Sequence, residues 1–192
     1  MRRKLILLAT VVAGMWGALS ALDAASRNIA PDAVSRASTW NEHTGEVSWL
    51  TDGLVPTSQD QPAQPFVWSS KGMLAFEWDQ VLPITQVRVC VGTADSDFEV
   101  RTYIGGHLSE DGSTRDPQGE RTATVADDSG ASNTWIVFDM PSGTQADNLE
   151  LKTQGAAELY EVEILSDQGS TPTAVGHGTW GRIKASVRAV EE

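Results

Sequence analysis

The stretch FEWDQVLPITQVRVCVG, residues 76–92, decides the fold class of this chain. Apolar and polar side chains alternate through FEWDQ (76–80) and again through ITQVRVCVG (84–92). This period of two residues is typical of a β-strand with one buried face, because successive side chains of a strand point to opposite sides of the sheet. The stretch therefore predicts two consecutive strands.

The same period continues along most of the chain after residue 26. Stretches rich in Gly, Pro, Asp, Ser or Asn separate the alternating runs, and no helical block lies between them. Short strands at this spacing predict an all-β fold of two packed antiparallel sheets, whose long loops are available for binding. The further runs are 98–106, 122–127, 134–140, 148–153 and 158–165, and the turn-rich stretches are 51–65, 105–120 and 127–133.

The first 26 residues have the pattern of an export leader. They begin with MRRK and continue as an apolar run that carries no charge until Asp23. Small residues allow cleavage after Ser20 or Ser26, whereas an uncut leader is long enough to anchor the chain in a membrane. Either outcome predicts a protein that is secreted or held in the cell envelope, with membrane contact only through an uncleaved leader.

Charge and motif content exclude several classes of function. The formal net charge of −12 becomes −14 without the leader, which contains three basic residues and one acidic residue. Such an acidic body repels phosphate backbones, so no nucleic-acid partner is expected. The single cysteine, Cys90, can form no internal disulfide and is predicted to be a buried, inert thiol. No nucleophile elbow, metalloprotease helix or phosphate loop is present, so no enzyme activity is expected.

The chain of 192 residues predicts one domain with two extensions. Its parts are a signal peptide or anchor helix at 1–26, a β-sandwich at 27–165, and a linker with a basic tail at 166–192. The last part of the tail fits both a strand and a helix. It could dock on the acidic body or a partner, or remain unstructured.

Five local signatures follow one another in a characteristic order: RNIAPDAVSRAS (27–38), LTDG (50–53), FVWSS (66–70), FEWDQVLPITQVRVCVG (76–92) and LYEVEIL (159–165). This order resembles the discoidin family, also called coagulation factor 5/8 type C domains. Its bacterial members include galactose-binding-like carbohydrate-binding modules. The resemblance implies an eight-stranded antiparallel jelly-roll β-sandwich. It also implies a non-catalytic domain that binds sugars, phospholipid head groups or proteins through loops at one end.

The resemblance also implies a structural calcium ion between the Asp-Gly loop and the last strand. Leu54 departs from the pattern, because such sites often have a polar side chain there. From the residues alone, Asp52 is explained as a turn former, and the alternation favours a solvated strand face for Glu161. Carried over by position, the hard oxygen ligands are the Trp49 carbonyl, the Asp52 carboxylate, Thr57, the Tyr160 carbonyl and the Glu161 carboxylate.

Two tryptophans and a histidine are candidate sugar ligands near the start of the domain. Trp40 and Trp49 flank the polar stretch NEHTGEVS (41–48), which contains His43. Aromatic faces stack on sugar rings, and an imidazole can hydrogen-bond a sugar hydroxyl. The other tryptophans of the strand-like runs, Trp68, Trp78 and Trp135, are predicted to fill the core or pack at a sheet edge.

Arg101 and His107 are further ligand candidates. Arg101 alternates with Glu99 and Tyr103, and His107 follows two glycines at the mouth of a long loop. Each has a structural alternative, because Arg101 could form a cross-strand ion pair and a lone loop histidine is often simply solvated.

The sequence as a whole predicts a non-catalytic module of a secreted or envelope-attached bacterial protein. Its predicted partner is a carbohydrate or a cell-envelope glycan, bound through loops at one end of the sandwich. The alternative is an envelope scaffold or adhesion protein that contacts another protein. Buried Trp40 and Trp49 side chains would favour the scaffold, whereas exposed loop aromatics beside polar groups would favour sugar binding.

Overall fold

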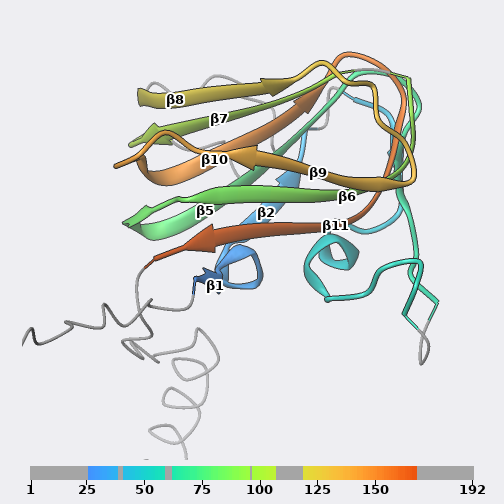
Figure 1. Ribbon diagram of the computed structural model, residues 1–192, viewed down its shortest axis with the longest axis horizontal. Helices are drawn as coiled ribbons and strands as arrows, with labels where there is room; N and C mark the ends of the chain where they lie inside the picture. Colours follow the sequence, from blue (N-terminus) through green and yellow to red (C-terminus); the bar gives the residue numbers. More distant parts are fainter. Residues whose placement is uncertain (1–25, 39–40, 59–61, 96, 107–118, 168–192) are drawn as a thin grey trace, which may run out of the picture.

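The fold is a sandwich of two antiparallel β-sheets (Figure 1). The computed structural model describes residues 26–38, 41–58, 62–95, 97–106 and 119–167. The first sheet has the strand order β3-β4-β11-β6-β9, and β1 also pairs with β11. The second sheet has the order β2-β5-β10-β7-β8.

Most strands run along the length of their sheet, and the fold also contains two short 3-10 turns. The first sheet contains β1 (Arg27–Asn28), β3 (His43–Thr44), β4 (Phe66–Trp68), β6 (Gln86–Ala94), β9 (Thr134–Asp139) and β11 (Ala157–Ser166). The second sheet contains β2 (Val34–Ala37), β5 (Gly72–Pro83), β7 (Phe98–Ile104), β8 (Glu120–Asp127) and β10 (Gln145–Thr153). The 3-10 turns are η1 (Ala30–Asp32) and η2 (Val47–Thr51).

The structure confirms the all-β, two-sheet expectation. Each alternating run of the sequence coincides largely with one of the strands β5 to β11, and β4 completes a set of eight. Three short strands, β1 to β3, precede this set. They contain only two to four residues each, too few for a period of two to be recognised.

The two runs of the opening stretch belong to different sheets. β5 ends at Pro83 in the second sheet, and β6 begins at Gln86 in the first. Backbone hydrogen bonds hold the corner between them: the Ile84 N–H donates to the Thr144 carbonyl (3.0 Å), and the Thr85 N–H donates to the Leu165 carbonyl (2.9 Å). This stretch therefore joins the two layers of the sandwich.

The core lies between the sheets and is built from the inward side chains of both. On β5 and β6 every second side chain lies in this layer: Leu74, Phe76 and Trp78, and Val87, Val89 and Val91. Trp68 and Trp78 are buried as predicted, and the Trp78 indole N–H donates to the Ile29 carbonyl at 3.1 Å. The largest buried side chains include Phe66, Phe76, Phe98, Phe138, Leu149 and Leu151.

The two ends of the domain lie side by side, because β1 pairs with the end of β11. β11 ends at Ser166, one residue beyond the predicted domain end. In the described ranges, no helix has the length and apolar character needed to cross a bilayer. The predicted leader and tail fall almost entirely outside those ranges, so they and the domain boundaries stay predictions.

Replacing Phe76 by alanine tests the core. Phe76 is fully buried, so Phe76→Ala should lower the free energy of unfolding by about 3 to 5 kcal/mol, through lost burial and the cavity left behind. Urea unfolding followed by tryptophan fluorescence measures the change. Val81→Ala is the matched control: Val81 is on the same strand but 39% exposed, so its substitution should change the free energy by about 0.5 kcal/mol or less. Equal losses for both variants would contradict this description of the core.

Candidate functional site

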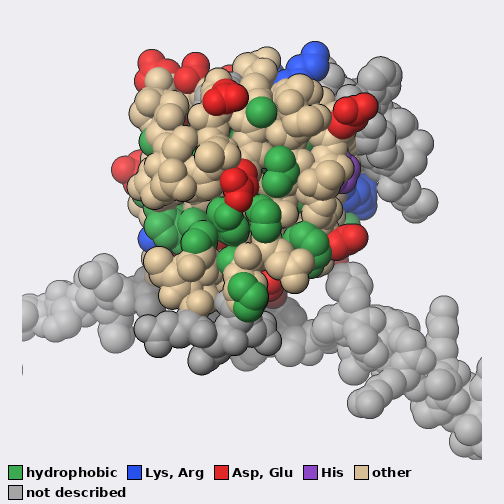
Figure 2. Space-filling view, turned by 90° about the vertical axis from the view of Figure 1, so that its right-hand side faces the viewer, with side chains coloured by type: hydrophobic (Ala, Val, Ile, Leu, Met, Phe, Trp, Pro, Cys, Tyr) green, Lys and Arg blue, Asp and Glu red, His purple; other side chains and the backbone are tan. Residues whose placement is uncertain are grey.

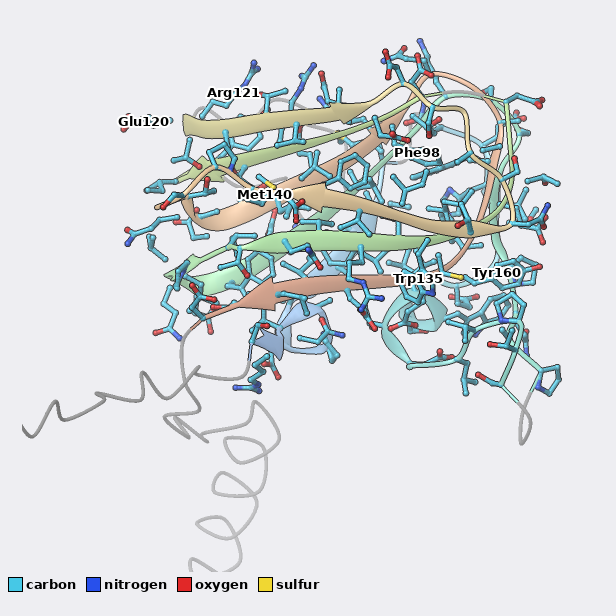
Figure 3. All side chains as sticks on the ribbon, in the orientation of Figure 1. Phe98, Glu120, Arg121, Trp135, Met140 and Tyr160 are labelled. Carbon is cyan, nitrogen blue, oxygen red and sulfur yellow. The ribbon has the colours of Figure 1, made fainter. Side chains whose placement is uncertain are left out.

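A hollow of about 230 Å³ lies at one end of the sandwich, between β6, β9, β11 and the segment that follows η2. We call it the aromatic hollow, because Trp135 and Tyr160 lie close together in it (Figure 3). Figure 2 shows this end of the molecule: hydrophobic side chains gather in its lower half, acidic ones are scattered among them, and basic ones lie at the margin. The lining residues are Val55, Pro56, Thr57, Cys90, Val91, Gly92, Asn133, Thr134, Trp135 and Tyr160.

The alternation of β9 presents Trp135 to the hollow. Ile136 and Phe138 point into the core, so Trp135 points to the outer face, where it is only half-buried. The Arg88 guanidinium lies 4.8 Å from the centre of the Trp135 ring and is paired with Glu163 at 2.6 Å. These contacts fix one side of the Trp135 indole, and the ring still lines the hollow.

Tyr160 is fixed by a chain of hydrogen bonds across the outer face of β11 and β6. Its hydroxyl donates to one carboxylate oxygen of Glu158, and the Thr93 hydroxyl donates to the other at 3.0 Å. The bond to Glu158 raises the pKa of Tyr160 to about 12, and the same bond lowers the pKa of Glu158. At neutral pH the pair is therefore a neutral phenol bound to a carboxylate.

Gly92 leaves room for this pair. A Cβ atom at this position would lie 2.8 Å from the Glu158 carboxyl carbon and 2.9 Å from Cε2 of Tyr160. Both distances are shorter than a carbon–carbon contact allows. The missing side chain of Gly92 therefore lets Glu158 and Tyr160 lie flat on the sheet beside the hollow.

Asn133 forms the opposite rim in an unusual backbone conformation. Its φ of 55° is the one positive value for a non-glycine residue in the described part of the chain. Its N–H donates to the Gly92 carbonyl at 2.5 Å. Asparagine tolerates the left-handed region better than most residues, and such conformations concentrate at binding sites. The turn places a polar residue at the edge of the aromatic hollow.

Glu161, a predicted calcium ligand, is buried rather than solvated. It is 2% exposed, and its Oε2 accepts a hydrogen bond from the Gly53 N–H at 3.1 Å. Burial raises the pKa of Glu161 to about 8, and the nearby charge of Asp52 adds to this rise. The carboxylate of the last strand and the Asp-Gly loop therefore meet in space, although 108 positions separate Gly53 from Glu161.

Asp52 has the turn-forming role that the sequence allowed, and its role as a calcium ligand stays a prediction. It is exposed and caps its own turn, because its Oδ1 accepts a hydrogen bond from the Leu54 N–H at 2.9 Å. It also lies near enough to Glu161 to affect the pKa of that group. No cluster of three or more His, Cys, Asp and Glu side chains that could hold a metal occurs in the described ranges. A calcium ion here would need carbonyl, hydroxyl or water oxygens in addition to the two carboxylates, which is a donor set that calcium accepts.

His43 and Trp49 lie away from the lining of the aromatic hollow. The exposed His43 ring stacks on Phe66, with 5.0 Å between ring centres, and its Nδ1 donates to the Asn41 carbonyl at 3.1 Å. Trp49 is half-buried against Gly45, where a Cβ would lie 3.1 Å from its ring. As sugar ligands, both stay predictions.

Arg101 lies on the outer face of the second sheet. It forms an ion pair with Glu99, two residues away on the same strand, and it stands opposite Glu150 and Thr124 on the neighbouring strands. The ion-pair reading of Arg101 therefore applies, although its partner is on the same strand and not across it.

Trp40 and His107 fall outside the described residues. As sugar ligands, both stay predictions. Among the described candidates, His43 and Arg101 lie in strands of different sheets.

Sequence reasoning missed Trp135 as a candidate ligand, and it considered Tyr160 only for its carbonyl. A signal for Trp135 was present, because the alternation that buries Ile136 and Phe138 must direct Trp135 to the opposite face. The proximity of the two rings could not be inferred, since it depends on which strands are neighbours.

No family model matches this chain, and no curated protein matches it. Solved structures do match it in fold. A family 32 carbohydrate-binding module from C. perfringens NanJ, in complex with galactose, has a TM-score of 0.51 and 11% sequence identity, and the match covers 73% of this chain and 99% of that module. A fucose-binding module from Streptococcus pneumoniae has a TM-score of 0.52 and 14% identity, and covers 73% of this chain and 96% of that one.

A third similar structure is a chitosan-binding module of a chitosanase/glucanase from Paenibacillus sp. IK-5. Its TM-score is 0.50 at 13% identity, and the match covers 72% of this chain and 98% of that module. At such identities the likeness concerns the fold. The chain has the discoidin-like, galactose-binding-like β-sandwich fold of these modules, as the resemblance implied.

The raised pKa of Glu161 predicts how stability depends on pH in the absence of metal ions. Between the ordinary value of 4.5 and about 8, the folded state holds a proton that the unfolded state has lost. The free energy of unfolding should therefore fall as pH rises through this window. Urea unfolding in EDTA from about pH 5 to about pH 8 measures the slope. Glu161→Gln should flatten it, whereas the exposed control Glu120→Gln should not. An unchanged slope in Glu161→Gln would contradict the assignment.

Proposed function

We propose that this chain is a non-catalytic carbohydrate-binding module whose sugar occupies the aromatic hollow. One observation carries the proposal: two half-buried aromatic rings, Trp135 and Tyr160, flank a concave surface with Thr57, Asn133 and Thr134 in its lining. A sugar ring offers apolar C–H faces for stacking and hydroxyl groups around its edge for hydrogen bonds. The hollow contains partners for both.

The size and composition of the hollow support a small neutral ligand. Its volume of about 230 Å³ is below the roughly 300 Å³ at which sites for drug-sized molecules begin, and suits a single sugar ring. Its lining contains no Asp or Glu in the described part of the chain, whereas glycoside hydrolysis usually needs two carboxylates. These features favour binding without cleavage.

The structural relatives support the same class of ligand. The C. perfringens module was solved with galactose, the S. pneumoniae module binds fucose, and the Paenibacillus module binds chitosan. This sandwich therefore carries sugar sites in other proteins. The apolar leader in the sequence supports a location outside the cytoplasm, where glycans of cell surfaces are accessible.

We also propose that calcium binds between Asp52 and Glu161. The ion would neutralise the buried carboxylate, with the Trp49 and Tyr160 carbonyls and Thr57 as the further protein ligands expected from the sequence. Thr57 also lines the aromatic hollow. The segment from Asp52 to Thr57 thus links the proposed ion site with the wall of the sugar site, and tying it to β11 would preorganise that wall.

A glycan array with the purified protein, run with and without calcium, tests the carbohydrate proposal. At least one glycan should bind, and Trp135→Ala should weaken its binding by about tenfold or more, through loss of the stacking surface. Val137→Ala is the matched control, since Val137 is 47% exposed on the same strand but is not part of the hollow. Binding of no glycan under either condition would contradict the proposal and favour the envelope-scaffold alternative.

Thermal unfolding tests the calcium proposal. With a dissociation constant on the order of 0.1 to 1 mM, about 10 mM calcium should stabilise the folded chain by about 1.4 to 2.7 kcal/mol and raise the midpoint. Asp52→Asn and Glu161→Gln should each abolish this rise, whereas Glu120→Gln should keep it. A midpoint that does not respond to calcium in the unaltered protein would contradict the site.

A further inference from the structure

A second, smaller hollow lies next to the aromatic hollow. It has a volume of about 100 Å³ and lies over the start of β11, between β4 and the end of β6. We call it the small hollow. Its lining includes Trp68, which is fully buried in the core. The lining residues are Val67, Trp68, Thr93, Ala94, Asp95, Ala156, Ala157 and Glu158.

The two hollows share a boundary. The small hollow reaches Glu158 and Thr93, and the aromatic hollow reaches Tyr160 and Gly92. Glu158 and Tyr160 are hydrogen-bonded to each other, and both lie against the same side of Gly92. This hydrogen-bonded pair of side chains therefore lies where the two linings meet.

We propose that the small hollow is a second sugar subsite, so that the protein binds glycans of at least two units along the outer face of its first sheet. This inference rests on the proposed function, because it places the first unit in the aromatic hollow. The second unit crosses the Glu158–Tyr160 pair and lies between Val67 and Asp95. The aromatic hollow suits one ring, and the small hollow, at about 100 Å³, would hold part of a second ring whose remainder faces solvent.

The charges around the small hollow define the class of the second unit. The hollow is bordered by the carboxylates of Glu158 and Asp95. No Lys or Arg is among the described residues that line the small hollow. A carboxylated sugar would therefore meet two like charges without a cation in the lining, whereas a neutral sugar can donate hydroxyls to them and an amino sugar can form an ion pair. The second unit is therefore a neutral or amino sugar.

Glu158 has two roles in this arrangement. It positions the Tyr160 ring for the first unit, and it borders the second unit with the same carboxylate. Variants of Glu158 would disturb both subsites at once. Changes at Val67 and Asp95, which line the small hollow alone, separate the subsites.

The test compares matched ligands by titration calorimetry on the full chain. The probes are galactose, fucose and glucosamine, a disaccharide of each sugar, and disaccharides in which one unit is a uronic acid. The best disaccharide should bind about tenfold more tightly than the best monosaccharide. Val67→Phe, which adds bulk to the small hollow, should reduce this ratio to about one and leave the monosaccharide affinity unchanged. Trp135→Ala should weaken both.

The outcomes distinguish this inference from the proposed function. Equal affinities for monosaccharides and disaccharides in the unaltered protein would overturn the second subsite and leave the carbohydrate function intact. Binding of no probe, together with no bound glycan on the array, would overturn both.

Asp95→Asn tests the charge argument without adding bulk, and Asp95 is exposed, so the fold should tolerate the change. It should improve binding of the uronic-acid disaccharides relative to the neutral ones by about threefold. An unchanged preference would overturn the exclusion of acidic sugars.

Discussion

The bulged pairing of β11 with β6 is the constraint on which the first sheet and its candidate site depend. β11 lies in the middle of this sheet, between β4 and β6, and also pairs with β1. Its register with β6 shifts between Ala157 and Leu159 and again between Leu159 and Glu161. Because the bulge displaces the alternation, the consecutive residues Tyr160 and Glu161 both lie on the outer side of the sheet: Tyr160 lines the hollow, and Glu161, opposite Cys90, is covered by the Gly53 loop. One strand thereby supplies an aromatic wall of the hollow and the buried acid beside Asp52.

The two sheets use their outer faces differently. On the second sheet, charged groups pair with one another. Glu150, which is 1% exposed, forms an ion pair with Lys152 at 2.8 Å and accepts a hydrogen bond from the Tyr103 hydroxyl at 3.2 Å. Burial raises the pKa of Tyr103, which keeps it a neutral donor. Removing one partner of such a buried pair would leave an uncompensated charge, so this face is best understood as structural. The hollows lie on the first sheet, where two aromatic rings and several polar groups retain free surface.

Much of the fold could be predicted from the period of two, because one buried face per strand leaves a direct pattern in the chain. The strands β5 to β11 and the two-sheet architecture were accessible in this way. The short strands and the division of β5 and β6 between sheets were not, because pairing depends on residues far apart in sequence. The resemblance implied a calcium ion between Asp52 and Glu161, which stays a proposal, whereas alternation alone placed Glu161 on a solvated face and the structure buries it. The difference arises because the Asp-Gly loop, 108 positions away in the sequence, covers this part of the outer face and donates the Gly53 N–H to Glu161.

The sequence by itself determined the class of the fold, the acidic character of the body, and the expectation that function lies in binding and not in catalysis. These properties depend on composition and local period, which the chain carries in every short segment. Only the tertiary structure decided which aromatic residues share a surface. Trp135 and Tyr160 are 25 positions apart, and they meet because β9 and β11 flank β6 and a glycine there leaves space above the sheet. Contacts of this kind arise from strand order and register, which no local pattern in this chain encodes.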